Sequence, residues 1–304
     1  MSLFKVNILG CSSATPTRRH SPSCQVVDYR GRLMMIDCGE GAQREMRRQG
    51  LKYSRLTDIF ISHLHGDHCF GLPGLLSTMS LHEKGGRLTI HMFREGIEVF
   101  KPFIDFFCGE TSFEIDWQPL QAAGRHVVLE TPSLVVESFP LYHRIPAVGF
   151  RFTEKEKPRH LRGDMIKFYN IPVSQLAAIK EGADFVTADG EVIANKWLTT
   201  PADKPMSYAY CSDTMADRRV AEAVRDVDLL YHEATYADDN EHLARARGHS
   251  TARQAGVIAR EARAGRLVIG HFSKRYDDES PLLKEAKEEF DNTILANEGL
   301  SIEL

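Results

Sequence analysis

Hydrophobic and polar positions along the chain follow two alternating patterns. Short runs rich in β-branched and aliphatic residues, typical of strands, precede longer stretches with apolar residues every three or four positions, typical of helices. In the first third this pattern predicts strands at 4–10, 24–31, 32–37, 59–61 and 88–93, and helices at 40–50, 74–86 and 95–107. The Arg30-Gly31 pair predicts a tight turn between the second and third strands.

The pattern changes in the middle of the chain. Residues 112–152 show successive strand signals, including 133–141 and 147–152, with no helical periodicity between them. Residues 154–200 are highly charged and hold little strand signal, so we interpret them as an arm inserted into the fold. Alternation then resumes, with predicted strands at 206–213, 228–234 and 266–272 and predicted helices at 215–224, 251–265 and 281–289.

The two strand-and-helix halves indicate an α/β protein with two sheets packed between outer helices, a four-layer αββα sandwich. We expect a single domain over 1–304, with 154–200 as a projecting arm within it. A chain of 304 residues exceeds the commonest domain size, but layered α/β folds of this length are common.

Composition narrows the class of protein. The 42% hydrophobic and 26% charged residues are those of a globular protein with ample core material. The formal net charge of −4 excludes a globally basic nucleic-acid coat but is compatible with a local basic surface. No apolar run approaches the roughly 20 residues of a membrane helix, and the N-terminus lacks a signal-peptide pattern. We therefore expect a cytoplasmic protein with no membrane association.

The six cysteines are scattered and form no CxxC pair. This spacing argues against a zinc finger, a thioredoxin-type site or a disulfide framework, so we expect reduced cysteines that lie mostly in the core. The thirteen histidines, by contrast, are not randomly placed.

The segment HLHGDH (63–68) directly follows a predicted buried strand, a position where α/β proteins commonly place chemistry. His63 and His65 point the same way from an extended segment, whereas Asp67 and His68 follow a glycine turn and can reach a neighbouring position. This arrangement suits two adjacent metal ions better than one. A solvated loop that is polar by chance is the alternative, but buried unpaired imidazoles and a carboxylate would be costly.

Three further candidates, His143, Asp213 and His271, each follow a strand signal. Each alone is a weak signal, since a histidine at a strand end is commonly a core or surface residue. Together with HLHGDH they supply seven ligands, about the number that two zinc ions need when a bridging carboxylate and a bridging water are counted.

This ligand pattern resembles that of the metallo-β-lactamase superfamily. More narrowly, the chain is similar to ribonuclease Z, the endonuclease family that trims tRNA precursors at their 3′ ends. The narrower resemblance rests on GCSSATPT (10–17), HLHGDHCFGLPGLL (63–76), CSDT (211–214), HEAT (232–235), GHST (248–251) and GHFSKRY (270–276). It implies that the predicted αββα sandwich is the metallo-β-lactamase fold.

The resemblance also implies roles for individual residues. One zinc ion would be held by His63, His65 and His143, the second by Asp67, His68 and His271, with Asp213 bridging the two. Asp67 would also accept a proton and orient the attacking hydroxide in line with the phosphorus atom.

His249, in GHST, is the candidate donor of a proton to the leaving 3′ oxygen. Thr251 and Gln254 predict a capping box, so His249 lies beside a helix N-terminus, whose dipole lowers the pKa of a histidine. A role as an acid therefore needs compensation, which Glu233 or the substrate phosphate could supply. The alternative is that His249 is a plain residue at the start of a helix.

The loop GCSSATPT could offer backbone N–H groups and hydroxyls to a phosphate, or it could be a plain strand-connecting turn. Arg18, Arg19 and His20, just beyond it, could contact an RNA backbone or simply be solvated.

In bacterial ribonuclease Z an arm grips the tRNA elbow, and 154–200 would be that arm here. It departs from the family's pattern, because Val173-Ser174-Gln175 stands where a glycine–proline step is usual. Residues 154–167 hold five Lys/Arg against three Asp/Glu, which suits phosphate contact, with a solvated charged hairpin as the alternative. The departure concerns how tRNA is gripped rather than the metal chemistry.

The resemblance implies a zinc-dependent endonuclease that leaves a 3′-hydroxyl on tRNA and a 5′-phosphate on the trailer. A hydrolase of the same fold that acts on a small phosphodiester or an ester is the alternative, but such an enzyme has no use for a basic insertion. Redox relatives with di-iron centres usually carry glutamate where His65 stands here.

The resemblance further implies a homodimer in which one subunit's arm serves the other's active site. The ligand set favours zinc, although manganese or iron could occupy it.

Overall fold

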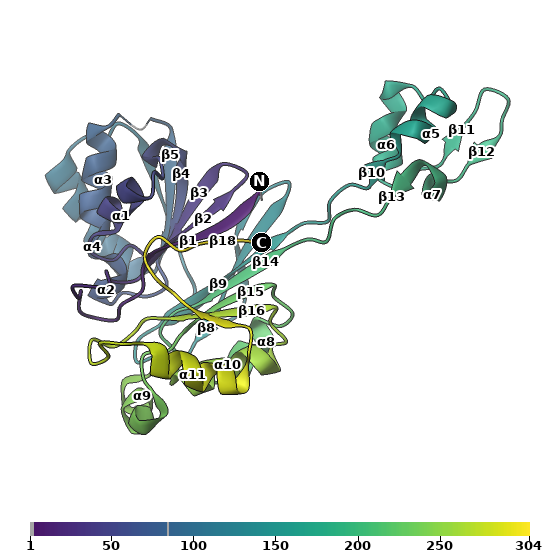
Figure 1. Ribbon diagram of the computed structural model, residues 1–304. Coiled ribbons are helices and arrows are strands. Elements are labelled where there is room, and N and C mark those ends of the chain that lie inside the picture. Colours follow the sequence, from purple (N-terminus) through teal and green to yellow (C-terminus); the bar gives the residue numbers. More distant parts are fainter. Residues whose placement is uncertain (1–2, 84) are drawn as a thin grey trace. The chain divides into compact units, whose positions relative to one another are not determined.

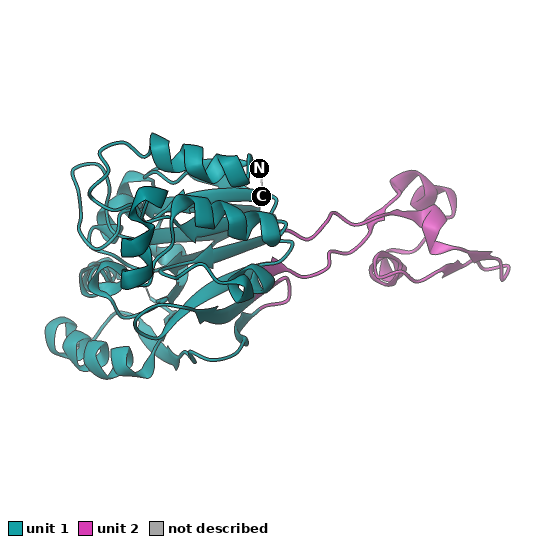
Figure 2. Cartoon of the chain, turned by 90° about the horizontal axis from the view of Figure 1, so that it is seen from below, with its two compact units in different colours: residues 1–130, 136–152, 207–304 teal, residues 131–135, 153–206 magenta. Residues whose placement is uncertain are grey.

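The computed structural model describes residues 3–83 and 85–304, which fall into two compact units. Unit 1 comprises residues 1–130, 136–152 and 207–304, and unit 2 comprises residues 131–135 and 153–206 (Figure 2). The segment interpreted as an insertion lies within unit 2.

The first sheet of unit 1 has seven strands in the order β18-β1-β2-β3-β4-β5-β6. They are β1 (Phe4–Gly10), β2 (Cys24–Tyr29), β3 (Arg32–Ile36), β4 (Leu56–Phe60), β5 (Arg87–Met92), β6 (Glu114–Pro119) and β18 (Ser301–Glu303). The predicted turn joins β2 to β3, and its Arg30 and Gly31 have positive φ angles of 51° and 87°. From β3 to β6 the strands are parallel, whereas β18 pairs antiparallel with β1.

The second sheet also has seven strands, in the order β17-β16-β15-β14-β9-β8-β7. They are β7 (His126–Glu130), β8 (Leu134–Leu141), β9 (Ala147–Glu154), β14 (Ser207–Cys211), β15 (Leu229–Glu233), β16 (Arg266–Gly270) and β17 (Thr293–Leu295). From β14 to β17 the strands are parallel. Every residue of β14 and β15 is buried, as expected of parallel strands that are covered on both faces.

Helices cover the outer face of each sheet in unit 1 (Figure 1). The first sheet carries α1 (Ala42–Arg48), α3 (Leu72–Leu81) and α4 (Arg94–Cys108), and the second carries α8 (Arg218–Ala223), α10 (Ala252–Glu261) and α11 (Ser280–Glu289). The inner faces pack on each other, with the Phe60 ring of β4 centred 5.3 Å from the Phe150 ring of β9. The predicted four-layer αββα sandwich is confirmed.

Unit 2 is built from short elements around a small apolar core. They are α5 (Gly163–Phe168), α6 (Leu176–Lys180), α7 (Asn195–Leu198) and the two-residue strands β10 (His160–Leu161), β11 (Phe185–Val186), β12 (Val192–Ile193) and β13 (Thr199–Thr200). The core consists of Ile171, Ile179, Phe185, Ile193 and Leu198.

Several details differ from the sequence-based prediction. The short helices α2 (Gly66–Cys69) and α9 (Glu241–Arg247) and the strands β17 and β18 were not predicted. The helix predicted from residue 215 begins only at Arg218, because Asp217 is its N-cap and accepts a hydrogen bond from the backbone N–H of Arg219. All six cysteines are free and five of them are buried, as predicted. Within 3–83 and 85–304, no helix has the length and apolar character needed to cross a bilayer.

Candidate metal centre

Each predicted metal ligand follows a strand of unit 1. The HLHGDH segment follows β4 and runs into α2, His143 follows β8, Asp213 follows β14 and His271 follows β16. β14, β15 and β16 are parallel, so their carboxyl ends share one edge of the second sheet. The structure brings all seven side chains together in two adjoining groups.

The first group consists of His63, His65, His143 and Asp213, whose ligand atoms all lie within 4.8 Å of one another. His65 Nδ1 lies 3.1 Å from His63 Nε2 and 3.2 Å from His143 Nε2. Asp213 Oδ2 lies 3.6 Å from His63 Nε2 and 3.9 Å from His143 Nε2. Three imidazole nitrogens and one carboxylate oxygen therefore face a common point.

The second group consists of Asp67, His68 and His271. Asp67 Oδ2 lies 3.4 Å from His68 Nε2 and 3.5 Å from His271 Nε2. The other oxygen of Asp213, Oδ1, lies 3.3 Å from His68 Nε2 and 3.1 Å from His271 Nε2. Because Asp213 directs one oxygen to each group, its carboxylate lies where a bridging ligand would.

Burial sets the charge of the first group, and nearby carboxylates set that of the second. Burial lowers the pKa of His63, His65 and His143, so these imidazoles are neutral, as metal coordination requires. Burial also disfavours a charge on His68, but Asp213 and other carboxylates outweigh it and raise its pKa well above the usual value. The second group therefore favours a positive charge, which a proton or a metal ion can supply.

Three buried atoms at the second group lie close to one another but make no hydrogen bond of acceptable geometry to any described residue. They are His68 Nε2, His271 Nε2 and Asp213 Oδ1. Unpaired polar atoms are costly in a protein core, so these atoms need a partner. Imidazole nitrogens and carboxylate oxygens are ligands that metal ions such as zinc accept. The residues present therefore fit a metal centre.

Hydrogen bonds fix the ring nitrogens that face away from the two groups. His143 Nδ1 donates to the Gly248 carbonyl oxygen at 2.7 Å, and His271 Nδ1 lies 2.8 Å from Thr235 Oγ1. Such partners set the tautomer and orientation of metal-binding histidines.

Asp37 is a residue of this centre that the sequence analysis missed. It follows β3, is fully buried and has a positive φ angle of 55°. Its Oδ2 accepts hydrogen bonds from His68 Nδ1 and from the Tyr210 hydroxyl, both at 2.7 Å, while its Oδ1 accepts one from the Ser62 backbone N–H. Asp37 thus positions His68. An acidic residue at the end of an apolar strand was the signal that could have identified it.

Replacing Asp37 with asparagine is expected to weaken metal binding ~10–100-fold, the usual effect of losing such a partner. The amide has no negative charge to hold the His68 imidazole. A chelator titration of the metal-loaded protein measures the change. Asp28→Asn, which alters a carboxylate paired with Arg55, is the control and should bind metal normally. Equal affinity of the Asp37 variant and the unchanged protein would contradict the positioning role.

His249 and Glu233 also meet beside the two groups. His249 Nδ1 lies 2.9 Å from Glu233 Oε1 and 3.8 Å from Asp213 Oδ2. Burial disfavours the imidazolium, but the Glu233 and Asp213 carboxylates outweigh it and raise the pKa of His249 to about 9. The predicted capping box of Thr251 and Gln254 is present at the start of α10. Glu233 thus lies where it can offset the helix dipole and keep His249 protonated at neutral pH.

A cavity of about 330 Å³ opens beside these residues. Residues 13–15 of the GCSSATPT loop form part of its lining, and Arg144, Arg247 and Lys274 place three positive charges around it. Such a cavity suits a phosphodiester, because guanidinium and ammonium groups bind phosphate oxygens. Arg144 and Arg247 were not predicted, since neither arginine belongs to a sequence motif.

Comparison with known proteins identifies the family. The chain is 51% identical to a ribonuclease Z from Bacteroides fragilis over 304 residues, which covers 100% of both chains. It is 49% identical to a ribonuclease Z from Porphyromonas gingivalis over 305 residues, again covering 100% of both. The chain belongs to the ribonuclease Z family.

Structural relatives agree with this assignment to the ribonuclease Z family. Human tRNase Z, short form, matches with a TM-score of 0.71 at 25% identity and covers 98% of each chain. The metallo-beta-lactamase fold protein YhfI from Bacillus subtilis matches with a TM-score of 0.69 at 18% identity, also over 98% of each chain. A family model described as Anti-Pycsar protein Apyc1 matches residues 4–98. The predicted metallo-β-lactamase fold of this ribonuclease Z family member is confirmed.

Proposed function

We propose that the protein is a metal-dependent endoribonuclease that removes the 3′ trailer from tRNA precursors. The observation that carries the proposal is the pair of ligand groups joined by Asp213, in a chain that aligns over its full length with ribonuclease Z. Cleavage leaves a 3′-hydroxyl on tRNA and a 5′-phosphate on the trailer. Action on tRNA precursors also suits a cytoplasmic enzyme.

Two zinc ions per subunit are the proposed cofactors. The ligands would be His63, His65 and His143 for one ion and Asp67, His68 and His271 for the other, with Asp213 as the bridge. When bound, such a pair lowers the pKa of water to about 7 and stabilises charge on phosphoryl oxygens.

The chain's own residues orient the reacting groups. Burial alone would raise the pKa of Asp67, but His68 and His271 hold it well below the usual range, so Asp67 is ionised. In that form it can accept a proton or a hydrogen bond from the attacking water and align it with phosphorus. At the leaving group, His249 donates a proton to the 3′ oxygen, with Glu233 as its hydrogen-bond partner.

Unit 2 is proposed to bind the body of the tRNA. It contains a cavity of about 620 Å³ whose lining mixes four cations with three carboxylates, namely Lys157, Arg159, Lys180, Lys204, Glu156, Glu181 and Asp203. Trp197 is 55% exposed, and Lys196 Nζ lies 5.5 Å from the centre of its ring. Cations beside an exposed aromatic ring are typical of surfaces that bind nucleic acid.

Replacing Lys180 and Lys196 with alanine is expected to raise KM for a tRNA precursor without changing kcat. For each phosphate that a lysine no longer neutralises, the dependence of log KM on log salt should also weaken by roughly 0.7–0.9. Steady-state kinetics at several salt concentrations measure both effects. A small chromogenic phosphodiester is the control substrate, because it has no tRNA body for unit 2 to bind. Equal effects on both substrates would contradict a tRNA-binding role for unit 2.

The protein is also proposed to form a homodimer through α4. Val99, Phe103, Phe106 and Phe107 on this helix are 66%, 44%, 80% and 66% exposed. They follow helical spacing, and the rings of Phe103 and Phe107 are centred 4.6 Å apart. An exposed aromatic stripe of this kind marks a protein interface, and a two-fold axis would let two copies cover each other's stripe.

Phe106→Glu is expected to give a monomer, because a buried unpaired carboxylate disfavours association. Light scattering coupled to gel filtration measures the mass. Val127→Glu, at an exposed position on β7, is the matched control and should remain dimeric. An unchanged mass for the Phe106 variant would exclude α4 as the interface.

The function itself is tested by offering the protein a tRNA precursor with a 3′ trailer and, separately, a small chromogenic phosphodiester. Metal-dependent cleavage after the discriminator nucleotide, lost in Asp67→Ala and after chelation, is the expected result. The ends of both products are identified by ligation and by phosphatase treatment. If only the small phosphodiester is cleaved, the metal centre is still catalytic but the assignment to tRNA precursors is wrong.

A further inference from the structure

A second set of metal-type ligands lies in unit 1, made of residues that the candidate centre does not use. Cys11, His20 and Glu298 place their ligand atoms within 4.8 Å of one another. Cys11 follows β1, and Glu298 lies between β17 and β18. His20, a candidate RNA contact from its sequence, is instead only 6% exposed. The set thus joins the loop after β1 to the C-terminal segment.

The sulfur–nitrogen distance matches a tetrahedral zinc site, whereas the hydrogen bond between His20 and Glu298 is shorter and would have to lengthen by about 0.5 Å to admit an ion. Cys11 Sγ lies 3.3 Å from His20 Nδ1 and 3.8 Å from Glu298 Oε1, and His20 Nδ1 lies 2.8 Å from Glu298 Oε2. Ligand atoms bonded to one tetrahedral zinc ion are separated by about 3.3–3.6 Å, as the zinc–sulfur, zinc–nitrogen and zinc–oxygen bond lengths require. The Ala296 carbonyl oxygen, 3.7 Å from Cys11 Sγ, is a further oxygen donor at the same place.

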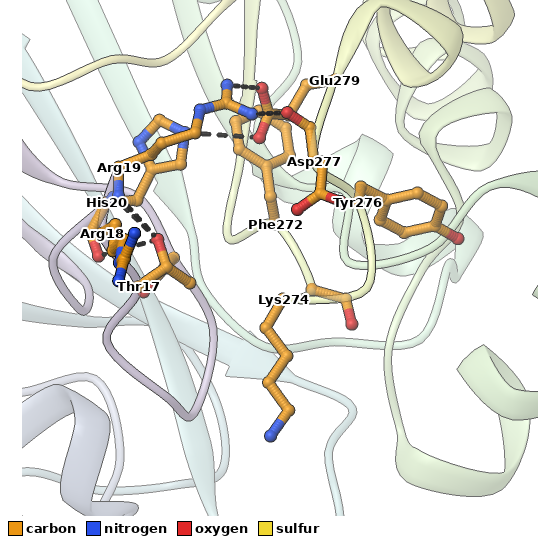
Figure 3. A pocket seen from close by; sticks show the side chains of 11 residues that line it. Thr17, Arg18, Arg19, His20, Phe272, Lys274, Tyr276, Asp277 and Glu279 are labelled. Carbon is orange, nitrogen blue, oxygen red and sulfur yellow. Dashed lines mark hydrogen bonds and ion pairs between the residues drawn. The ribbon is translucent and has the colours of Figure 1, made fainter.

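The opposite nitrogen of the His20 ring, Nε2, makes no hydrogen bond to a described residue but faces a carboxylate that would be its partner in a metal-bound state. His20 Nε2 faces Glu279 Oε1 at 3.3 Å, and Arg19 pairs with the same carboxylate (Figure 3). Histidines that bind a metal through one nitrogen commonly donate the other N–H to a carboxylate. Glu279 would fix His20 with Nδ1 directed at the ion.

The charges of the three ligands also balance those of a divalent cation. Burial raises the pKa of the Cys11 thiol well above its usual value, and Glu298 and Glu279 raise it further. Without a metal ion the thiol therefore keeps its proton. On binding, the S–H proton and the Nδ1 proton that His20 donates to Glu298 both leave to solvent, and sulfur–metal and nitrogen–metal bonds form, so one thiolate and one carboxylate neutralise a charge of +2.

We propose that Cys11, His20 and Glu298 bind a third metal ion of the zinc class, in addition to the two assigned to the candidate centre. A cavity of about 190 Å³ whose lining includes His20, Arg19 and Glu279 borders this set on the Nε2 side of the His20 ring (Figure 3). The bound ion would tie the loop after β1 to the C-terminal segment. Residues 13–15 of that loop line the catalytic cavity, so the ion would hold one wall of the active site in place.

Loading the protein with cobalt(II) distinguishes the proposed third ion from the two ions at the candidate metal centre. The candidate centre has only nitrogen and oxygen ligands, whereas the proposed set contains a cysteine. The full-length protein loaded with cobalt(II) should therefore show a thiolate-to-cobalt charge-transfer band in the near ultraviolet. The band should disappear in Cys11→Ala and persist in Cys24→Ala, the control at a buried cysteine of the apolar core.

Metal content provides the second measurement. The unchanged protein should hold one zinc ion more per chain than Cys11→Ala, His20→Gln or Glu298→Gln by elemental analysis. Glu279→Gln should retain the ion with ~10–100-fold weaker affinity, since it removes only the outer partner. Circular dichroism identifies any variant that fails to fold. The metal content of the folded variants then tests whether the third ion is bound by these residues.

Two results would overturn the proposal. One is the absence of a thiolate band from the cobalt protein, and the other is a band or metal content that all three ligand substitutions leave unchanged. In either case His20 is simply an imidazole held between two glutamates. Neither result bears on the tRNA assignment, because that assignment depends on residues outside this set.

Discussion

Asp213→Ala is expected to abolish cleavage of a tRNA precursor. Asp213 directs one carboxylate oxygen to each ligand group, so its removal leaves both groups incomplete and leaves His68 without its strongest negative neighbour. The loss of a single electrostatic stabiliser in an active site already costs about 10²–10³-fold in kcat, and this change should exceed that. Cleavage assays and elemental analysis should show that activity and bound metal fall together.

The matched control for this variant is Asp217→Ala, a change on the same connection between β14 and α8. Asp217 caps α8, so its removal should lower stability by about 0.5–2 kcal/mol without affecting the reaction. Thermal unfolding and kinetics then separate the two effects. An Asp213 variant that keeps full activity with two bound ions would show that the bridge is dispensable.

His249→Gln is expected to lower kcat by about 10²–10⁴-fold, the usual contribution of a general acid, with little change in KM or metal content. The leaving 3′ oxygen then departs without a proton. A substrate with sulfur in place of that oxygen needs no proton donor and should be cleaved by the variant almost as fast as by the unchanged protein. Equal losses with both substrates would contradict the acid role.

The dependence on pH follows from the same pair of residues. A general acid must be protonated, so the rate should fall as pH rises through the pKa of His249, which is raised to about 9. Glu233→Gln removes the first of the carboxylates that raise this pKa, so the fall should move to lower pH. In His249→Gln this alkaline fall should be absent. A fall at the same pH in all three proteins would assign it to another group.

Much of the fold could be predicted because local pattern and final structure agree. β1 has the predicted bounds 4–10, and α4 lies within one residue of the predicted helix at each end. The HLHGDH segment was identifiable because four metal-type ligands within six residues are a local signal. His143 could be recognised as a metal ligand only in combination with HLHGDH, Asp213 and His271.

The rest depended on contacts between distant segments. β18 is three residues long, and pairing with β1 rather than its own sequence makes it a strand. The role of Asp37 requires His68, which is 31 residues away. His271 has a φ angle of 62°, a conformation that histidine rarely adopts, and no local pattern predicts it. These features are imposed by tertiary structure.

The pairing of β18 with β1 has a consequence for how the protein is made. Because β1, at residues 4–10, has one of its two neighbours at residues 301–303, the first sheet stays open at that edge until those distant residues have been synthesised. A nascent chain can form its hydrophobic clusters earlier, but long-range pairing of this kind comes late. The first sheet therefore gains its last strand only once residues 301–303 join it, and removing those three residues would leave β1 with an open edge.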